Sequence, residues 1–192
     1  MMKSIKNVAD ILERKSFPEF LEALDYHVDI KEWSEVGGVY KIVRMIMQHY
    51  NPDIVFDIGC GKRPTLGTVL ALNYKQPVFC IDPILDASLA SKIRRLYKYN
   101  DTLDEWLNDR DRRQFAFRKK ALICANHSHS SKTELLALTK CFEEWVLVTV
   151  PCCVDNRLNE GVALHMKDRH MHTPKNDIYI WASDTELLKK LI

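Results

Sequence analysis

An alternation of short apolar runs with helical segments constrains the fold more than any other feature of the sequence. The runs have the length and composition of strands and lie at 53–58, 77–82, 120–126 and 145–151. Apolar residues at three- and four-residue spacing follow the first three runs and predict helices at 65–74, 86–99 and 132–144. Repeated strand–helix units predict a parallel sheet, and strands that are apolar almost throughout indicate that helices cover both of its faces.

The flanking segments extend this pattern at both ends. Helical spacing predicts helices at 8–14, 17–28 and 37–50, while the tail predicts a strand at 176–183 and a short helix at 184–192. We therefore expect one domain over 1–192, with N-terminal helices in 1–50 and an α/β core in 51–192. The predicted fold class is α/β, a three-layer sandwich with a mainly parallel sheet.

Composition and the N-terminal sequence indicate the compartment in which the protein resides. The 192 residues are 46% hydrophobic and 28% charged, and no window approaches the ~18 consecutive apolar residues of a membrane span. The N-terminus does not have the pattern of a secretory signal. Several of the six cysteines fall in strand-like runs, where a reduced thiol packs as a small apolar group. We expect an intracellular, cytoplasmic protein with neither a membrane span nor a disulfide framework.

A glycine loop follows the first predicted strand. Asp57 ends the strand, and Gly59 and Gly61 lie in the turn before the next helix, where backbone amides can face a ligand. The dinucleotide pattern G-x-G-x-x-G would need a third glycine at the position of Pro64. A carboxylate ahead of the glycines suits a positively charged ligand better than a pyrophosphate. A nicotinamide-dependent oxidoreductase is therefore the third-ranked hypothesis.

The stretch DIGCG (57–61) resembles motif I of class I S-adenosylmethionine-dependent methyltransferases, written (D/E)-x-G-x-G-x-G. Asp82, at the end of the second strand, resembles the acid that holds the ribose hydroxyls in that family. The resemblance covers roughly 37–151. It implies a Rossmann-like fold, S-adenosylmethionine as cofactor, and a cofactor site formed by Asp57, Gly59, Cys60, Gly61 and Asp82.

One residue departs from the motif. Arg63 stands where the family has its third glycine, and its side chain could crowd the methionine end of the cofactor or bind a substrate phosphate. Two functions stay open on this ground. The first is an S-adenosylmethionine-dependent methyltransferase, and the second is a catalytically inactive protein of the same fold that binds a nucleic-acid or protein partner.

The stretch NHSHSS (126–131) follows the third strand of the core. In the resembled family this position faces the transferred methyl group, although the N/D-P-P-Y/F motif of the DNA amino-methylating members is absent. Asn126 and His127 are the predicted catalytic residues, since either could orient an acceptor or take its proton. The alternative is a polar loop in which Ser130 or Ser131 caps the next helix.

Cysteines and histidines accumulate in the segment after the fourth strand. Cys152 could act as a nucleophile like the cysteine of RNA cytosine methyltransferases, although the Asp-Ala-Pro-Cys-type motif that accompanies it there is missing. Packing is the alternative role. His165, His170 and His172 lack the paired spacing of a metal site, and the adjacent Cys152 and Cys153 cannot easily give two tetrahedral ligands. No metal is predicted.

Basic residues accumulate from Lys92 to Lys120. This stretch has ten Lys or Arg against five Asp or Glu, with aromatic residues interleaved. A solvated helical face is one interpretation. The other is a surface for phosphates and stacked bases, which predicts RNA or another nucleic acid as partner and acceptor. The sequence leaves the acceptor atom and the oligomeric state open.

Overall fold

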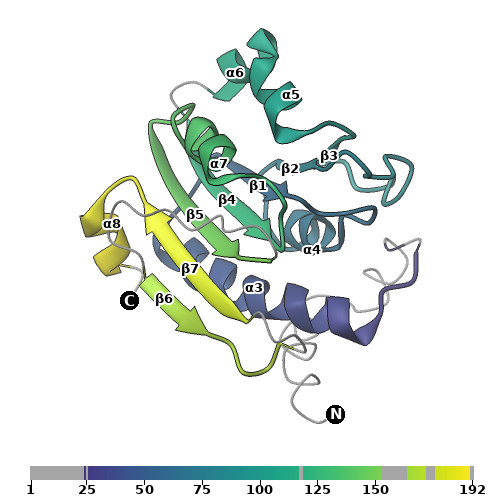
Figure 1. The fold of residues 1–192 in the computed structure, drawn as a ribbon, viewed down its shortest axis with the longest axis horizontal. Coiled ribbons are helices and arrows are strands. Elements are labelled where there is room, and N and C mark those ends of the chain that lie inside the picture. Colours follow the sequence, from purple (N-terminus) through teal and green to yellow (C-terminus); the bar gives the residue numbers. More distant parts are fainter. Residues whose placement is uncertain (1–23, 25, 117–118, 153–163, 172–175, 191–192) are drawn as a thin grey trace.

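A computed structural model describes residues 24, 26–116, 119–152, 164–171 and 176–190. In this part of the chain one seven-stranded sheet has the order β3-β2-β1-β4-β5-β7-β6 (Figure 1). The strands are β1 (Ile54–Ile58), β2 (Val78–Ile81), β3 (Leu96–Tyr99), β4 (Lys120–Asn126), β5 (Glu144–Val150), β6 (Leu164–Lys167) and β7 (Asp177–Ala182).

The pairing of the strands confirms the mainly parallel sheet. Strands β3, β2, β1, β4 and β5 run parallel, β7 is antiparallel to β5, and β6 is antiparallel to β7. Central strand β1 is buried along its whole length. The carboxyl ends of the parallel strands therefore meet at one edge, where the loops after β1, β2 and β4 come together.

Helices cover both faces of the sheet, which confirms the three-layer sandwich (Figure 1). One core contains side chains of α3 (Ile30–His49), α4 (Thr65–Asn73) and α8 (Thr185–Lys190). The opposite core contains side chains of α5 (Leu103–Asn108) and α7 (Lys132–Thr139), and α6 (Arg110–Ala116) follows α5. No helix in the described ranges is long and apolar enough to cross a membrane.

The alternation of side chains along β1 divides the two cores. Val55 faces the α3 and α4 side, and Phe56 faces the α5 and α7 side. The Phe56 ring meets Trp106 edge-on at 5.3 Å between centroids and lies 5.5 Å from both Phe79 and Phe142. This aromatic cluster joins β1, β2 and α5 and fixes the central strand from which the glycine loop emerges.

The prediction of a helix at 86–99 is wrong. This segment forms a series of turns and then β3, which pairs with β2. Asp86 accepts hydrogen bonds from Ser88, and Ala90 has a φ of 51°, which is incompatible with a helix. Tyr97 stacks on Phe79 at 4.8 Å, so packing along the edge of β2 outweighs the helical spacing.

Other boundaries differ less. Helix α3 begins at Ile30 rather than at 37, because Asp29 accepts a hydrogen bond from the Glu32 amide at 2.8 Å and caps the helix. Helix α7 ends at Thr139, five residues before the predicted end. Strand β6 and helices α5 and α6 were not predicted. The helix predicted at 8–14 and most of that at 17–28 lie outside the described residues.

Candidate functional site

The glycine loop after β1 depends on two left-handed backbone positions. Gly59 and Gly61 have φ values of 72° and 68°. A Cβ on Gly59 would lie 2.6 Å from the Cα of Ser128, whereas a Cβ on Gly61 would have no atom within 4 Å. Gly59 thus lets two loops pack closely, and Gly61 leaves open space in which a ligand could approach the backbone.

Asp57 lies beneath this loop and is only 1% exposed. Its Oδ2 accepts a hydrogen bond at 2.8 Å from the amide of Gly67, the third residue of α4. Pro64, the residue before α4, makes no side-chain cap, so Asp57 supplies the acceptor that the helix start lacks. Burial raises the pKa of Asp57 to about 7.

Asp82 follows β2 and fastens the other side of the loop. Its Oδ2 accepts a hydrogen bond from the Gly61 amide at 2.8 Å, and its Oδ1 accepts one from the Ile84 amide at 2.9 Å. Each carboxylate oxygen can accept a second hydrogen bond. Asp82 therefore stabilises the loop and could still receive ligand hydroxyls.

Two clefts flank the glycine loop, and both are lined by Gly59, Gly61 and His127. The first, here called the α3 cleft, encloses about 270 Å³ and has walls from α3, the glycine loop and the end of β4. The second, here called the β2 cleft, encloses about 430 Å³ and has walls from the loops after β2 and β4. The glycine backbone is thus the shared wall of two adjoining hollows.

The two clefts differ in chemistry. Carboxylates of Glu32, Glu35 and Asp57 line the α3 cleft, together with the basic residues Lys62 and Arg63. The β2 cleft combines Asp82 with apolar side chains, namely Ile81, Pro83, Ile84 and Leu103. One ligand that spans both clefts would have a polar, cationic end on one side and a flat apolar end on the other.

Arg63 is turned toward α3. Its guanidinium lies 2.6 Å from Glu32 Oε2 and donates to the carbonyl of His27. Thr65 Oγ1 donates to the other carboxylate oxygen of Glu32. The residue in the third-glycine position is therefore bound to an acid of α3, and it links the glycine loop to the start of that helix.

The predicted catalytic residues lie at the junction of the clefts. Asn126 ends β4 and lines the α3 cleft, and His127 follows with a φ of 52° while its amide donates to the Val150 carbonyl at 2.9 Å. His127 Nε2 lies 3.5 Å from Glu35 Oε1. Sequence reasoning missed Glu35, because nothing in the sequence indicates that an acid on α3 reaches the loop after β4.

The alternative role of this loop is also present. Ser131 caps α7 through a reciprocal capping box with Glu134, and Ser128 Oγ accepts a hydrogen bond from the Ser130 amide at 3.1 Å. One short segment therefore starts a helix and lines both clefts.

Cys152 and the histidines of the next segment do not converge. Cys152 is half-buried, and it is absent from the linings of both clefts. His165 pairs with Asp177 at 2.8 Å, and His170 pairs with Asp168 at 3.2 Å. Cys153 and His172, which the sequence offers as further metal ligands, lie outside the described residues.

Three potential metal ligands do come together beneath the glycine loop. The ligand atoms of Asp57, Cys60 and Cys80 all lie within 4.8 Å of one another. A hydrogen bond with Cys80, together with burial, raises the pKa of the Cys60 thiol, and burial raises that of Cys80. The group packs the loop against β2, and the expectation of no metal stays a prediction.

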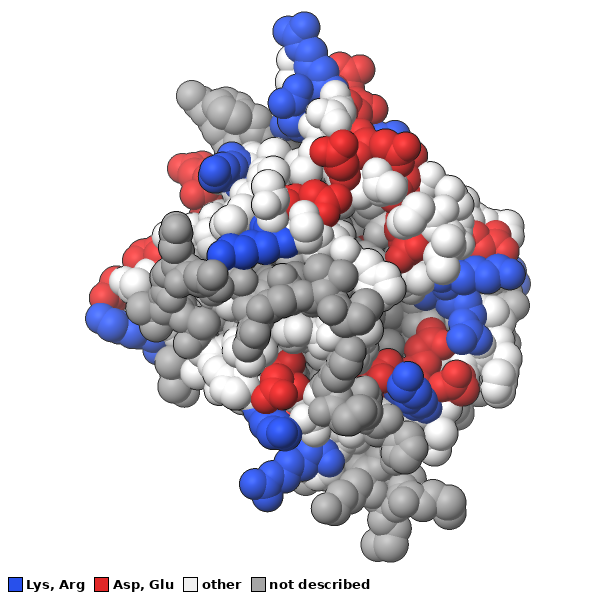
Figure 2. All heavy atoms as spheres, viewed as in Figure 1, with Lys and Arg blue, Asp and Glu red and all other residues white. Residues whose placement is uncertain are grey.

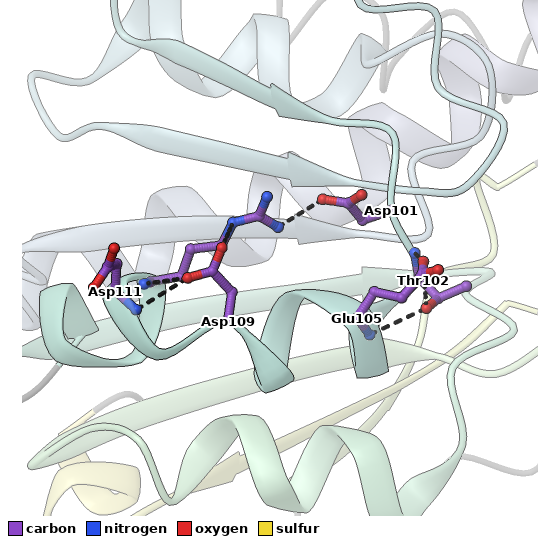
Figure 3. Close-up of polar contacts among 6 residues, drawn as sticks. Asp101, Thr102, Glu105, Asp109 and Asp111 are labelled. Atoms are coloured by element: carbon purple, nitrogen blue, oxygen red, sulfur yellow. Dashed lines mark hydrogen bonds and ion pairs between the residues drawn. The ribbon is translucent and has the colours of Figure 1, made fainter.

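The basic stretch from Lys92 to Lys120 does not form one continuous surface, because the fold pairs some of its residues with acids and buries others. Arg112 pairs with Asp101 at 2.6 Å and with Asp109 at 3.0 Å (Figure 3). Its guanidinium also lies over the Tyr99 ring. Trp106, one of the aromatic residues interleaved in this stretch, is 1% exposed and therefore unable to stack on a base. Helix α6 leads into the start of β4, at the sheet edge opposite the clefts, and Figure 2 shows acidic side chains beside the basic ones there.

The two loop glycines give a matched pair of variants. We expect Gly61→Ala to lower the free energy of unfolding by about 1 to 2 kcal/mol, the cost of a left-handed alanine. Gly59→Ala adds the clash with Ser128, for a total of about 2 to 4 kcal/mol. Urea unfolding measures both values. Equal losses for the two variants would contradict the close packing of the loops.

The buried acid predicts a specific pH dependence. The folded-state pKa of Asp57, about 7, exceeds the unfolded value near 4, so the folded protein binds a proton that the unfolded chain releases. The free energy of unfolding should therefore fall between pH 4 and pH 7 by about 3 kcal/mol more in the wild type than in Asp57→Asn. Urea unfolding across this range tests it, and parallel curves would exclude the shifted pKa.

This chain resembles known proteins in its fold and not in its sequence. No protein-family model and no curated protein matches the sequence. Among solved structures, a mutant of MtNAS in complex with S-adenosylmethionine matches with a TM-score of 0.54 and 10% identity, covering 95% of this chain and 72% of that one.

Two further solved structures match less well. A cyclopropane-fatty-acyl-phospholipid synthase-like protein from Lactobacillus casei has a TM-score of 0.42 and 14% identity, covering 68% of this chain, which spans 56% of that protein. A SAM-dependent methyltransferase from Agrobacterium tumefaciens has a TM-score of 0.46 and 9% identity, covering 82% and 63% of the two chains. The chain has the Rossmann-like α/β fold of class I S-adenosylmethionine-dependent methyltransferases, as its DIGCG motif and Asp82 implied.

Proposed function

We propose that this protein binds S-adenosylmethionine and transfers its methyl group to an acceptor. The observation that carries the proposal is the pair of clefts that meet at Gly59 and Gly61, with Asp82 in one and carboxylates in the other. The MtNAS structure that matches this chain contains S-adenosylmethionine, which supports the same cofactor here.

The chemistry of the clefts fits the two ends of this cofactor. In the β2 cleft, Asp82 would accept the ribose hydroxyls, and Ile84 and Leu103 would contact the adenine. In the α3 cleft, the open backbone of Gly61 and the carboxylates of Glu32 and Glu35 would face the positively charged end. Asp57 and Cys60 would act beneath the loop by fixing its shape. When bound, the cofactor supplies an electrophilic methyl group.

Arg63 is the residue that supports the second hypothesis. On that hypothesis the protein has this fold and binds a partner, but it does not catalyse methyl transfer. The Arg63–Glu32 pair lines the α3 cleft, where the arginine side chain occupies the place of the family's third glycine. Binding of cofactor and product without transfer to any acceptor would favour this second function.

A nucleic-acid acceptor and a cytoplasmic location stay predictions. The ion pairs of Arg112 and the burial of Trp106 weaken the argument for a stacking surface near the clefts. Lys92, Arg94 and Arg113 are exposed and could still contact phosphates.

The cofactor proposal predicts a selective loss of affinity. S-adenosylmethionine and S-adenosylhomocysteine should bind the wild type, and NAD should not. Asp82→Ala should weaken both by about 10- to 100-fold, because hydrogen bonds from a charged acceptor are worth about 1.5 to 3 kcal/mol. Isothermal titration calorimetry measures each affinity.

Asp86→Ala is the matched control for that experiment. Asp86 lies four residues further along the same loop, is partly exposed and accepts hydrogen bonds from Ser88. Its removal should leave cofactor affinity unchanged. Tight NAD binding, or equal affinities in the wild type and Asp82→Ala, would contradict the proposed site.

Nucleic-acid binding predicts a dependence on salt. If the exposed cations contact single-stranded RNA, each phosphate contact contributes about 0.7 to the slope of log affinity against log salt. The combined variant Lys92→Ser, Arg94→Ser, Arg113→Ser should then lower the slope by up to about 2, as measured by fluorescence anisotropy. Absence of binding at low salt, or an unchanged slope, would leave the stretch as a solvated surface.

A further inference from the structure

Glu35 and His127 come from segments far apart in the sequence and meet in the α3 cleft. His127 Nε2 and Glu35 Oε1 are 3.5 Å apart, and both atoms are buried from solvent. The Lys31 ammonium approaches the same Glu35 oxygen at 3.8 Å, but its side chain is 61% exposed, so water screens that contact. The histidine contact is therefore the more sheltered of the two.

The backbone around both residues holds this contact in place. Glu35 lies in the second turn of α3, whose N-terminus is capped by Asp29. His127 adopts a left-handed φ of 52° and is held by its hydrogen bond to Val150. A residue other than glycine in this region costs folding energy and is characteristic of functional sites. The fold thus fixes the backbone from which each of the two side chains enters the cleft.

The electrostatic setting favours a proton between the two groups. Burial raises the pKa of the Glu35 carboxyl, so a positive charge opposite it offsets the cost of its ionisation. Carboxylates outnumber basic groups around the imidazole. The other charged or titratable residues that line the two clefts with His127 are Glu32, Asp57, Cys60, Lys62, Arg63, Asp82, His129 and Glu134.

We propose that Glu35 is a positioning residue that orients His127 and raises the affinity of its imidazole for a proton released by the acceptor. This inference rests on the proposed function. The acceptor is then a nitrogen or oxygen nucleophile that carries a hydrogen. Its lone pair bonds to the methyl carbon, the carbon–sulfur bond breaks with both electrons staying on sulfur, and the acceptor's proton passes to Nδ1 of the neutral His127 imidazole, whose Nε2–H faces Glu35.

The pairing is tested by the pKa of His127, which needs no acceptor. Proton–nitrogen correlation NMR of the histidine rings gives this pKa, and His127→Asn identifies the signal. An opposite charge this close raises an imidazole pKa by about one unit or more. We expect Glu35→Gln to lower the His127 pKa by about that amount, and Glu35→Asp, which keeps the charge on a shorter chain, to give an intermediate value.

Glu32→Gln is the matched control. Glu32 lies one turn earlier on α3 and lines the same cleft, but its carboxylate is bound to Arg63. Its removal should shift the His127 pKa much less than Glu35→Gln does. An unchanged pKa in Glu35→Gln, or equal shifts in the two variants, would overturn the pairing. Should Glu35→Gln not fold, as judged by circular dichroism, the comparison of Glu35→Asp with Glu32→Gln decides.

A second measurement tests whether His127 faces the reacting centre. S-adenosylmethionine and S-adenosylhomocysteine differ by one methyl group and one positive charge. The His127 pKa should therefore be lower by about half a unit or more in the saturated S-adenosylmethionine complex. Equal values in the two complexes would place His127 away from the transferred group and overturn its role. Failure of both ligands to bind would refute the proposed function, while the ligand-free titrations would still decide the pairing.

Discussion

The hydrogen bond from the Gly67 amide to the buried Asp57 carboxyl is the contact on which the site depends. It joins the end of β1 to the start of α4, and the intervening residues must then form the glycine loop. Close packing reinforces this junction, since a Cβ on Gly67 would lie 2.2 Å from the Cys80 sulfur. Helix α4 therefore packs directly against β2 at Gly67, and no side chain fits between them.

The division of charge between the clefts follows from where each wall originates. The β2 cleft is built from ends of strands and the start of α5, which carry apolar side chains toward the interior. The α3 cleft receives Asp57 from β1, and it receives Glu32 and Glu35 from a helix outside the strand–helix repeat. The repeat thus supplies the loop, and α3 supplies the other two acids of the cleft.

Local patterns in the sequence were sufficient for strands β1, β2, β4, β5 and β7, for the glycine loop and for the position of Asp82 after β2, because apolar periodicity and turn chemistry act over a few residues. They were insufficient for β3, where stacking of Tyr97 on Phe79 outweighed helical spacing. They also missed Glu35, because its role depends on a contact with His127, ninety-two positions away, that only the folded chain creates. Arg63 was recognised as unusual, but its partner Glu32 could not be identified for the same reason.

The close approach of Gly59 to Ser128 has a mechanical consequence. One loop carries the shared wall of both clefts, and the other carries His127 between them, so neither loop can shift without displacing the other. The two clefts are therefore joined through one packed contact. We expect a molecule that displaces either loop on binding to change the affinity of the other cleft as well.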